Sequence, residues 1–337
     1  MPIDNTSADE PESITLFKKT LKNFDTPEGR AAGVAMTPRR GDVFITTPPK
    51  CGTTLLQQAA HQLRIARRDD GSVRLDEDFV EISRVVPWIE LAHDLQQRLE
   101  DEQVTTPRHF KTHLWAGHAP SECNPTADGE RAVAKVVLCI RHPYDAVTSF
   151  YRFLVGWMAP TSAVTLDDFA RHFFLGRGKP TSPSQNSSYF HFVASWIPIA
   201  LADPSRVRMF AFERLTTDRD THLRRLAAHL DIPLDDDLLS AVSTATSFAY
   251  MKEHESLFNE NLSKELRNPA MGLPADAGSS ISKVRRGAIG DGSASLSPEI
   301  RAAIDQAWTD VVLPATGAAT YEELVAKMYK EQWGQED

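Results

Sequence analysis

One segment, residues 42–58 with the sequence DVFITTPPKCGTTLLQQ, constrains the fold of this chain more than any other. It opens with six residues that are β-branched and apolar enough for an interior parallel strand, which a pair of prolines then ends. Apolar residues recur at helical spacing from Leu55 onward. The segment therefore predicts a buried strand joined to a helix by a tight turn between Lys50 and Thr54.

The turn carries the donors that bind an anion. Gly52 lets the backbone approach a ligand closely, and the first N–H groups of the helix have no helical carbonyl to bond. Thr53 and Thr54 add hydroxyl groups, and Lys50 adds a full charge. The usual nucleotide-binding motif places its lysine after the second glycine, whereas Lys50 precedes Gly52. An ordinary turn with a solvated lysine remains the alternative for this segment alone.

Composition limits what the anion can be. The chain has 337 residues, of which 41% are hydrophobic and 25% charged, as in globular proteins. Its formal net charge of -9 argues against a surface that coats nucleic acid, so we expect a local anion pocket and no nucleic-acid partner. Residues 1–13 are acidic and polar, and we expect them to form a disordered tail.

Cysteine usage and hydropathy indicate the compartment. Cys51, Cys123 and Cys139 are too few and too scattered for a disulfide framework or a zinc site. The N-terminus lacks the apolar core of a signal peptide, and no later stretch of about 18 apolar residues could span a membrane. We therefore expect a cytoplasmic protein with no transmembrane segment and no bound metal.

Strands alternate with helices along the chain, which predicts an α/β fold with a central parallel sheet flanked by helices. Without a linker or repeat, residues 14–337 form one predicted domain, with a lid-like loop at 253–297 and C-terminal helices within 298–337. The expected strands are 42–47, 108–112, 135–140 and 206–212, and the expected helices are 14–24, 53–67, 143–153, 218–230, 298–312 and 321–332.

Two further basic segments could bind anions. Arg141 stands at the carboxyl end of a predicted strand, and Ser149 lies about two turns into the helix that follows. A magnesium-dependent nucleotide hydrolase would be expected to carry an acidic residue near such a position. The second segment, Lys283 to Gly287, ends the predicted lid, although a basic cluster is often only a solvated face. Three separated cationic sites suggest a ligand with phosphates at both ends.

These motifs together resemble the cytosolic-type sulfotransferases, P-loop-like enzymes that move a sulfonate from 3′-phosphoadenosine 5′-phosphosulfate (PAPS) to a hydroxyl or amine. The similarity spans residues 42–291. TTPPKCGTT resembles the family's 5′-phosphosulfate loop, RHPYDAVTSFYRF its 3′-phosphate motif, and RRG with a following GD its closing segment. The donor-binding residues that the resemblance implies are Lys50, Cys51, Gly52, Thr53, Thr54, Arg141, Ser149, Phe212, Thr246, Ser247, Phe248, Arg285, Arg286 and Gly287.

The resemblance also implies the catalytic residues. The triplet Lys111-Thr112-His113 is similar to the family's K-T-H, which carries the catalytic histidine. His113 would remove the acceptor's proton during in-line displacement, and an imidazole with a pKa near neutrality suits that role. Lys50 would neutralise the bridging oxygen of the leaving nucleotide, and Lys111 the sulfonate oxygens. Adenosine 3′,5′-bisphosphate (PAP) would be the product, with no metal involved.

The acceptor side is less specific. Residues 86–90, VPWIE, resemble the family loop that lines acceptor pockets, and we expect that pocket to include Pro87, Trp88, Trp115 and Phe153. These side chains favour a small apolar or aromatic acceptor, an alcohol or a phenol. Base rates alone suggest a homodimer.

Some positions depart from the family pattern. Leu55 replaces a tryptophan that flanks adenine, which would weaken donor binding by about 1 to 3 kcal/mol. Cys51 replaces a serine, either as a small residue that supplies its backbone N–H or as an oxidation-sensitive thiolate. Two alternative functions stay open on the sequence: an ATP- or GTP-dependent phosphotransferase, and a nucleotide-binding protein without catalysis.

Overall fold

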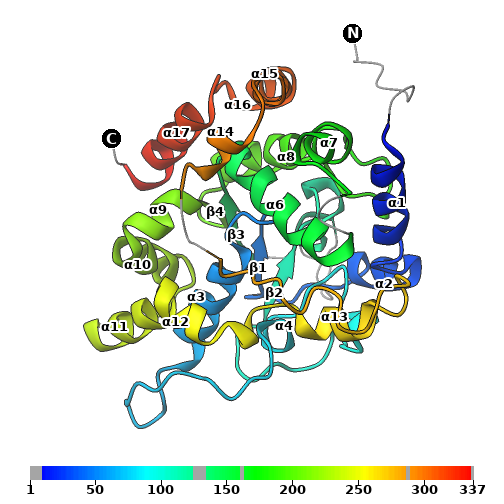
Figure 1. The fold of residues 1–337 in the computed structure, drawn as a ribbon. Coiled ribbons are helices and arrows are strands. Elements are labelled where there is room, and N and C mark those ends of the chain that lie inside the picture. The colour runs from blue at the N-terminus through cyan, green and yellow to red at the C-terminus, as the bar shows by residue number, and fades with distance from the viewer. Residues whose placement is uncertain (1–9, 124–133, 160–162, 286–288, 335–337) are drawn as a thin grey trace.

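A computed structural model describes residues 10–123, 134–159, 163–285 and 289–334 of the chain. At its centre lies a four-stranded sheet in the order β2-β1-β3-β4, with every neighbouring pair parallel (Figure 1). The predicted α/β class with a central parallel sheet is confirmed. The strands are β1 (Val43–Thr46), β2 (His109–Thr112), β3 (Lys135–Ile140) and β4 (Val207–Ala211).

Strand register brings the predicted site to one edge of the sheet. Thr46 of β1 pairs with Thr112 of β2 and with Leu138 of β3, so these strands run to the same edge. All four strands lead into predicted site residues: the 5′-phosphosulfate loop after β1, His113 after β2, Arg141 after β3 and Phe212 after β4. Ligands in parallel sheets bind at this carboxyl edge.

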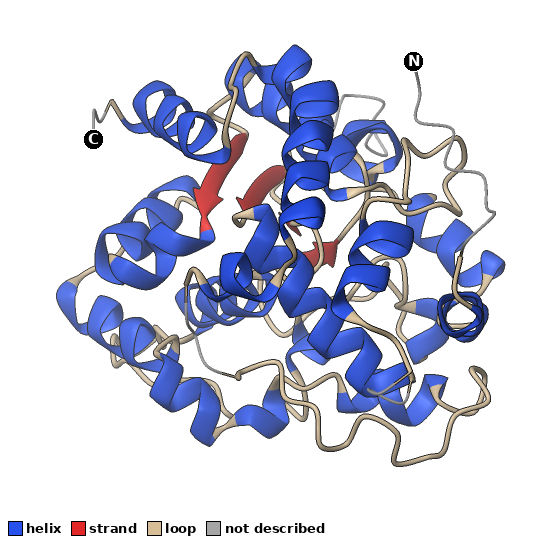
Figure 2. Ribbon diagram, turned by 45° about the horizontal axis from the view of Figure 1, so that its top comes forward, coloured by secondary structure: helices blue, strands red, loops and turns tan. Residues whose placement is uncertain are grey.

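Both faces of the sheet are covered by helices, which surround the strands in Figure 2. Alternate strand residues enter two separate hydrophobic clusters: Phe44 and Val136 face one, Ile45 and Val137 the other. The cluster with Ile45 includes apolar side chains of α3 (Thr53–Ile65), α10 (Arg219–His229) and α11 (Asp236–Ala245). The cluster with Phe44 includes those of α6 (Pro143–Met158), α8 (Tyr189–Ala202), α15 (Pro298–Ala307) and α17 (Tyr321–Trp333).

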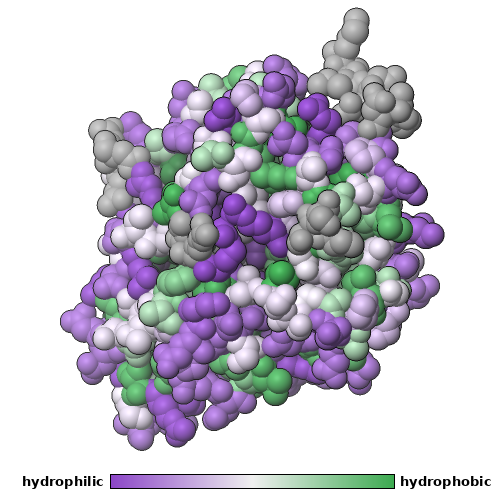
Figure 3. All heavy atoms as spheres, viewed as in Figure 1, coloured by the Kyte–Doolittle hydropathy of each residue, from purple (hydrophilic) through white to green (hydrophobic). Residues whose placement is uncertain are grey.

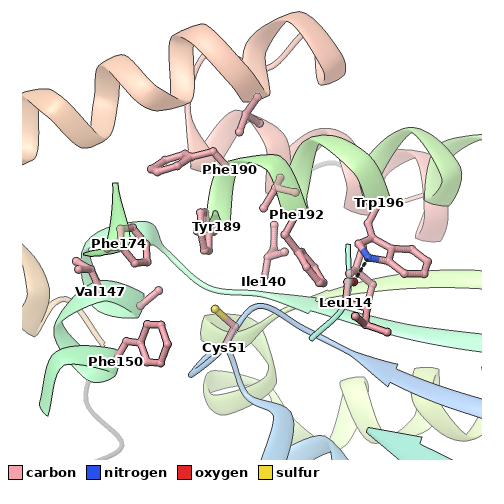
Figure 4. Packing of buried hydrophobic residues seen from close by; sticks show 14 of the residues in the cluster. Cys51, Leu114, Ile140, Val147, Phe150, Phe174, Tyr189, Phe190, Phe192 and Trp196 are labelled. Carbon is pink, nitrogen blue, oxygen red and sulfur yellow. Dashed lines mark hydrogen bonds between the residues drawn. The ribbon is translucent and has the colours of Figure 1, made fainter. Parts of the chain in front are cut away.

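The buried helix α8 supplies many side chains of the cluster that contains Phe44. Tyr189 and Phe192 project from it toward Ile140 at the end of β3 (Figure 4). Trp196 lies beside Leu114, and its indole N–H donates to the Leu114 carbonyl at 3.0 Å. Ser188 caps the helix by accepting a hydrogen bond from the backbone N–H of His191 at 3.1 Å. The sequence analysis did not predict this helix.

Other helices are shorter. The N-terminal helix begins at Glu12, so the chain is already ordered before the expected end of the tail at residue 13. The remaining helices are α1 (Glu12–Leu21), α2 (Pro27–Val34), α4 (Ile82–Val85), α5 (Pro120–Cys123), α7 (Leu166–Phe169), α9 (Phe212–Thr217), α12 (Phe248–Glu253), α13 (Asn261–Arg267), α14 (Asp291–Ser295) and α16 (Leu313–Thr316), the 3₁₀ helices η1 (His93–Leu95), η2 (Ala116–His118) and η4 (Glu255–Leu257), and the π-helical turns η3 (Ala170–Phe174) and η5 (Trp308–Val312).

The lid-like segment at 253–297 contains more regular structure than its sequence suggested. It includes α13 and α14, and the side chains of Phe258 and Asn268 are fully buried. Part of this segment is therefore packed into the domain. None of the helices in the described ranges combines the length and the apolar character needed to cross a bilayer.

Candidate active site

A cavity of about 390 Å³ opens where the strands end. Its walls come from the β1–α3 turn, the end of β2, α6 and the segment that follows α13. Hydrophilic side chains surround a hollow near the centre of the face seen in Figure 3. The predicted site residues that line it are Lys50, Gly52, Thr53, Thr54, Trp88, Lys111, His113, Arg141, Ser149, Phe153, Phe212, Thr246, Phe248 and Arg285.

The β1–α3 turn presents backbone donors to the cavity. Lys50 and Gly52 both adopt positive φ angles, 66° and 95°. The bond from Leu56 N–H to the Gly52 carbonyl, at 3.0 Å, opens the helical pattern of α3. The N–H groups of Thr53 and Thr54 precede it and therefore have no carbonyl within the helix. This is the geometry of an anion site at a helix N-terminus.

Gly52 is required because an aromatic ring lies against it. A Cβ atom built at Gly52 would lie 2.9 Å from Cδ2 of Phe212, a contact too short for any side chain. On Phe212 in turn lies the Arg141 guanidinium, with its central carbon 4.5 Å from the ring centroid. The turn, the ring and the arginine therefore form one stack at the cavity wall.

Cations gather around Lys50. Burial, followed by the nearby charges of Lys283, Arg141 and Lys111, holds the pKa of Lys50 well below its ordinary value. Its ammonium nitrogen lies 4.3 Å from the centroid of the Phe153 ring. These positive charges repel one another, and an anion bound among them would relieve the repulsion.

Glu260 holds two of these cations in place. Its carboxylate oxygen Oε1 lies 2.8 Å from the Lys111 ammonium and also pairs with Lys283. Burial opposes ionisation of Glu260, but the two lysines outweigh it and hold the pKa of this carboxyl well below its usual range. The Lys111 ammonium also lies 3.7 Å from the Trp88 ring centroid. Burial lowers the pKa of Lys283 to about 8.

His113 has a defined orientation. Its Nδ1 atom lies 2.7 Å from the carbonyl oxygen of Thr47, and its backbone N–H donates to Glu90 Oε1, also at 2.7 Å. The Trp88 ring meets the imidazole edge to face at 5.1 Å. Burial and the charge of Lys111 lower the pKa of His113 to about 3. A carbonyl can only accept, so Nδ1 carries the proton and Nε2 is the basic nitrogen.

The lid segment docks beside Arg141. Asp145 of α6 accepts hydrogen bonds from the backbone N–H groups of Gly290 and Gly292, at 2.8 and 2.7 Å. The same carboxylate lies 3.6 Å from the Arg141 guanidinium. Within the described parts of the chain, no hydrogen bond occupies the Ser149 hydroxyl. The end of the lid segment therefore packs against the first turn of α6, beside Arg141.

Of the residues expected around the adenine, some line the cavity and others do not. Phe248 is 42% exposed and lines the cavity, together with Leu55 and Thr246. The Thr246 hydroxyl donates to the Val242 carbonyl at 2.7 Å. Ser247 does not line the cavity, because its hydroxyl caps α12. The expected residues Arg286 and Gly287 lie outside the described residues.

The acceptor side of the cavity is aromatic, but two expected residues do not line it. Phe24 packs against Trp88 and Trp157, with ring centroids 5.7 and 5.6 Å away. Pro87 is buried, and its carbonyl accepts from the Lys111 backbone N–H. Trp115 lies against His118 and Lys179, beside η2.

Cys51 is fully buried next to Ile140 (Figure 4). Burial raises the pKa of its thiol far above the ordinary value, because an apolar environment disfavours the thiolate. The interpretation of Cys51 as an oxidation-sensitive thiolate is therefore wrong. The alternative, a small residue at a tight turn, agrees with this burial.

Some cavity residues were missed by the sequence analysis. Glu260 and Arg177 belong to no motif, and nothing in their local sequence distinguishes them from surface charges. Lys283 was part of the basic cluster but was not predicted to lie beside Lys50. In the described ranges, no group of three or more His, Cys, Asp or Glu side chains could share a metal ion.

Comparison with known proteins gives a family. The family described as "Sulfotransferase domain" matches residues 40–324. Human sulfotransferase 1E1 is 25% identical over 262 residues, which cover 77% of this chain and 81% of that protein. Human sulfotransferase 4A1 is 27% identical over 221 residues, covering 64% of this chain and 69% of its own length.

Solved structures share the fold. A retinol dehydratase in complex with androsterone and PAP superimposes with a TM-score of 0.63 at 18% identity, over 90% of this chain and 94% of that one. Mouse sulfotransferase SULT7A1 complexed with PAP gives a TM-score of 0.59, also at 18% identity, over 86% and 90%. At such identity the likeness establishes the fold.

Proposed function

The chain belongs to the sulfotransferase family, and from this premise we propose that it transfers a sulfonate from PAPS to the hydroxyl of a small acceptor, with His113 as the general base. One observation carries the assignment of the base: a neutral imidazole, its proton fixed on Nδ1 by Thr47, lines a cavity crowded with cations. Neither feature alone would be specific.

The base has the right protonation state. A pKa of about 3 leaves His113 neutral at physiological pH with a lone pair on Nε2, but it is lower than the near-neutral pKa expected from the sequence. The negative charge of bound PAPS would raise this pKa, because it offsets the charge of Lys111. The acceptor oxygen attacks sulfur as its proton passes to Nε2, and the bond between sulfur and the bridging phosphate oxygen breaks. PAP leaves with that electron pair. Thr47 then stabilises the imidazolium, because its carbonyl already accepts from Nδ1–H.

The cations have distinct places in this reaction. Lys50, in the turn before α3, neutralises the charge that develops on the bridging oxygen. Lys111 lies at the end of β2, two residues before His113, and stabilises the sulfonate oxygens. Lys283 shares Glu260 with Lys111, which brings its ammonium to the same place. Fixed cations in a water-poor cavity stabilise such charge strongly.

The donor assignment is supported by the two-ended arrangement of anion sites. The free N–H groups of α3 and Lys50 suit a 5′-phosphosulfate, while Arg141, Ser149 and the docked lid suit a 3′-phosphate. The two solved structures compared above are complexes with PAP. An ATP- or GTP-dependent phosphotransferase is not supported by the family match.

Calorimetry with the full chain tests the donor site. We expect PAP to bind at least about tenfold more tightly than AMP, because the 3′-phosphate adds charge-assisted hydrogen bonds. A labelled-sulfate transfer assay over phenols and aliphatic alcohols then tests catalysis. Equal affinity for PAP and AMP would refute the donor assignment. Tight PAP binding without transfer to any acceptor would favour the non-catalytic alternative.

A further inference from the structure

One arginine at the cavity wall has no anionic partner among the described residues. Arg177 follows η3 and lines the cavity. Its guanidinium carbon lies 4.0 Å from the Phe173 ring centroid and 5.7 Å from that of Phe150. Across residues 10–123, 134–159, 163–285 and 289–334, no hydrogen bond or ion pair reaches this side chain. Stacking on rings leaves the donor atoms of the guanidinium unused.

The neighbouring arginine shows what a satisfied cation in this region looks like. Arg30 is 4% exposed, pairs with Asp25 at 2.8 Å and donates to Asn186 Oδ1, also at 2.8 Å. The pKa of Arg177 falls to about 10 through burial and the charge of Arg30. Arg177 is half-buried and lines the cavity, where a planar guanidinium stacked on a ring keeps its N–H donors available to an oxyanion.

Arg177 lies toward the acceptor side. The residue before Asp25 packs against Trp88, and Trp88 packs against His113. Asp25 pairs with Arg30, whose charge acts on Arg177. Ring contacts and one ion pair therefore lead from His113 to Arg30, and Arg30 lies close enough for its charge to act on Arg177.

Arg152 also lines the cavity, but it does not lie on the proposed acceptor side. Arg152 lies three residues after Ser149 on α6, on the same side of the helix. It therefore faces the donor's 3′-phosphate site, where PAPS itself supplies the anion. Arg177 has no such donor phosphate assigned to it.

We propose that Arg177 binds an anionic group, a carboxylate or a phosphate, carried by the acceptor at the end remote from its reactive hydroxyl. The inference rests on the proposed function and narrows its acceptor class. The wall between the two ends is aromatic and includes Phe150, Phe153, Trp157 and Phe174. The acceptor is accordingly a hydroxy acid or a hydroxylated phosphate ester with an apolar spacer, and a planar guanidinium suits either oxyanion.

Binding is tested on the full chain saturated with PAP, which occupies the donor site and removes catalysis from the measurement. The probes are hydroxyphenylpropionate and omega-hydroxydodecanoate, each with its neutral methyl ester, and para-hydroxybenzyl phosphate with para-hydroxybenzyl alcohol. By calorimetry, we expect an anionic probe to bind about 10 to 100-fold more tightly than its neutral partner. The carboxylate and phosphate arms show which oxyanion is preferred.

Variants locate the effect. Arg177→Gln should abolish the preference for the anion while leaving affinity for the neutral partner and for PAP unchanged. Arg177→Lys should retain part of the preference, because it keeps the charge but loses the fork. Arg171→Gln is the matched control, since Arg171 lies exposed on the same segment outside the cavity, and it should behave as the wild type. PAP affinity reports whether each variant has folded.

The outcomes separate this inference from the proposed function. An equal affinity for anionic and neutral probes, binding of neither, or a preference that survives Arg177→Gln would overturn the role of Arg177. If the wild type transfers sulfonate to neutral alcohols without favouring acids, the inference fails alone. If no sulfonate is transferred from PAPS to any probe, the proposed function fails, while the binding preference still decides the anion site.

Discussion

The Nδ1 atom of His113 lies 2.7 Å from the carbonyl oxygen of Thr47, and this contact decides which imidazole nitrogen holds the proton. Thr47 directly follows β1 and His113 directly follows β2, two strands whose last residues pair with each other. The tautomer of the proposed base is therefore fixed by strand register, which requires no dedicated acidic partner for the ring.

Replacing the base should remove transfer and spare donor binding. We expect His113→Asn to lower the rate of sulfonate transfer by about 10² to 10⁴-fold, the usual contribution of a general base. PAP affinity, measured by calorimetry, should stay unchanged. His93→Asn is a control, because His93 is exposed and does not line the cavity. Normal transfer by His113→Asn would disprove the assignment of the base.

The depressed pKa of His113 predicts its behaviour with pH. Nitrogen NMR of the histidine side chains should show His113 neutral, with Nδ1 protonated, throughout the range from about pH 5 to 8. A titration of this ring near pH 6.5 would contradict the structure.

The same shift affects stability. Between its ordinary pKa of about 6.5 and the folded value of about 3, the unfolded state binds the proton and the folded state does not. The group therefore makes the free energy of unfolding fall as pH falls through this window. We expect urea unfolding of His113→Asn to lose part of that pH dependence. An unchanged dependence would contradict the predicted linkage.

The close approach of Phe212 makes Gly52 irreplaceable. Gly52→Ala would place a Cβ 2.9 Å from the Phe212 ring and force alanine into a positive φ of 95°. We expect a loss of about 1 to 3 kcal/mol in unfolding free energy, together with weaker PAP binding, because the turn must shift. Gly178→Ala is the control, since a Cβ there meets no atom within 4 Å. Equal stability and PAP affinity in both variants would disprove the packing argument.

Glu260 is expected to hold Lys111 and Lys283 in place and so to stabilise the fold. Glu260→Gln removes the one negative charge that Lys111 and Lys283 share, and leaves two buried ammonium groups facing each other. Breaking a buried ion pair in this way costs about 3 to 5 kcal/mol. Urea unfolding should show that loss, and the variant should also transfer sulfonate more slowly. A stability equal to that of the wild type would show that the network is not needed for folding.

Local sequence patterns were sufficient for the sheet and for the phosphate turn. The strand expected at 135–140 is β3, Lys135–Ile140, and α3 begins at Thr53 as expected. These elements are specified by neighbours in sequence: a β-branched run, a proline pair and a helical period. The ends of parallel strands meet at one edge of a sheet, so the sequence was enough to assign Lys50, His113 and Arg141 to that edge.

Helix α8, by contrast, could not be recognised from its pattern. Tyr189–Ala202 is apolar on most sides because it is buried in the larger cluster, so its sequence shows no amphipathic period. Trp115 was misplaced for a related reason: an aromatic residue can face a pocket or the core, and only packing decides which.

The sequence by itself determined the family, because each motif that carries the resemblance is continuous in sequence and obeys local rules. The tertiary structure alone decided the surroundings of those motifs. Glu260 meets Lys111 across 149 positions of sequence, and Arg177 has no ion-pair partner in the part of the chain that the structure describes. Ion pairing and burial depend on distance in space, so the pKa of His113, the pairing of the two lysines with Glu260 and the position of Arg177 are properties of the folded chain.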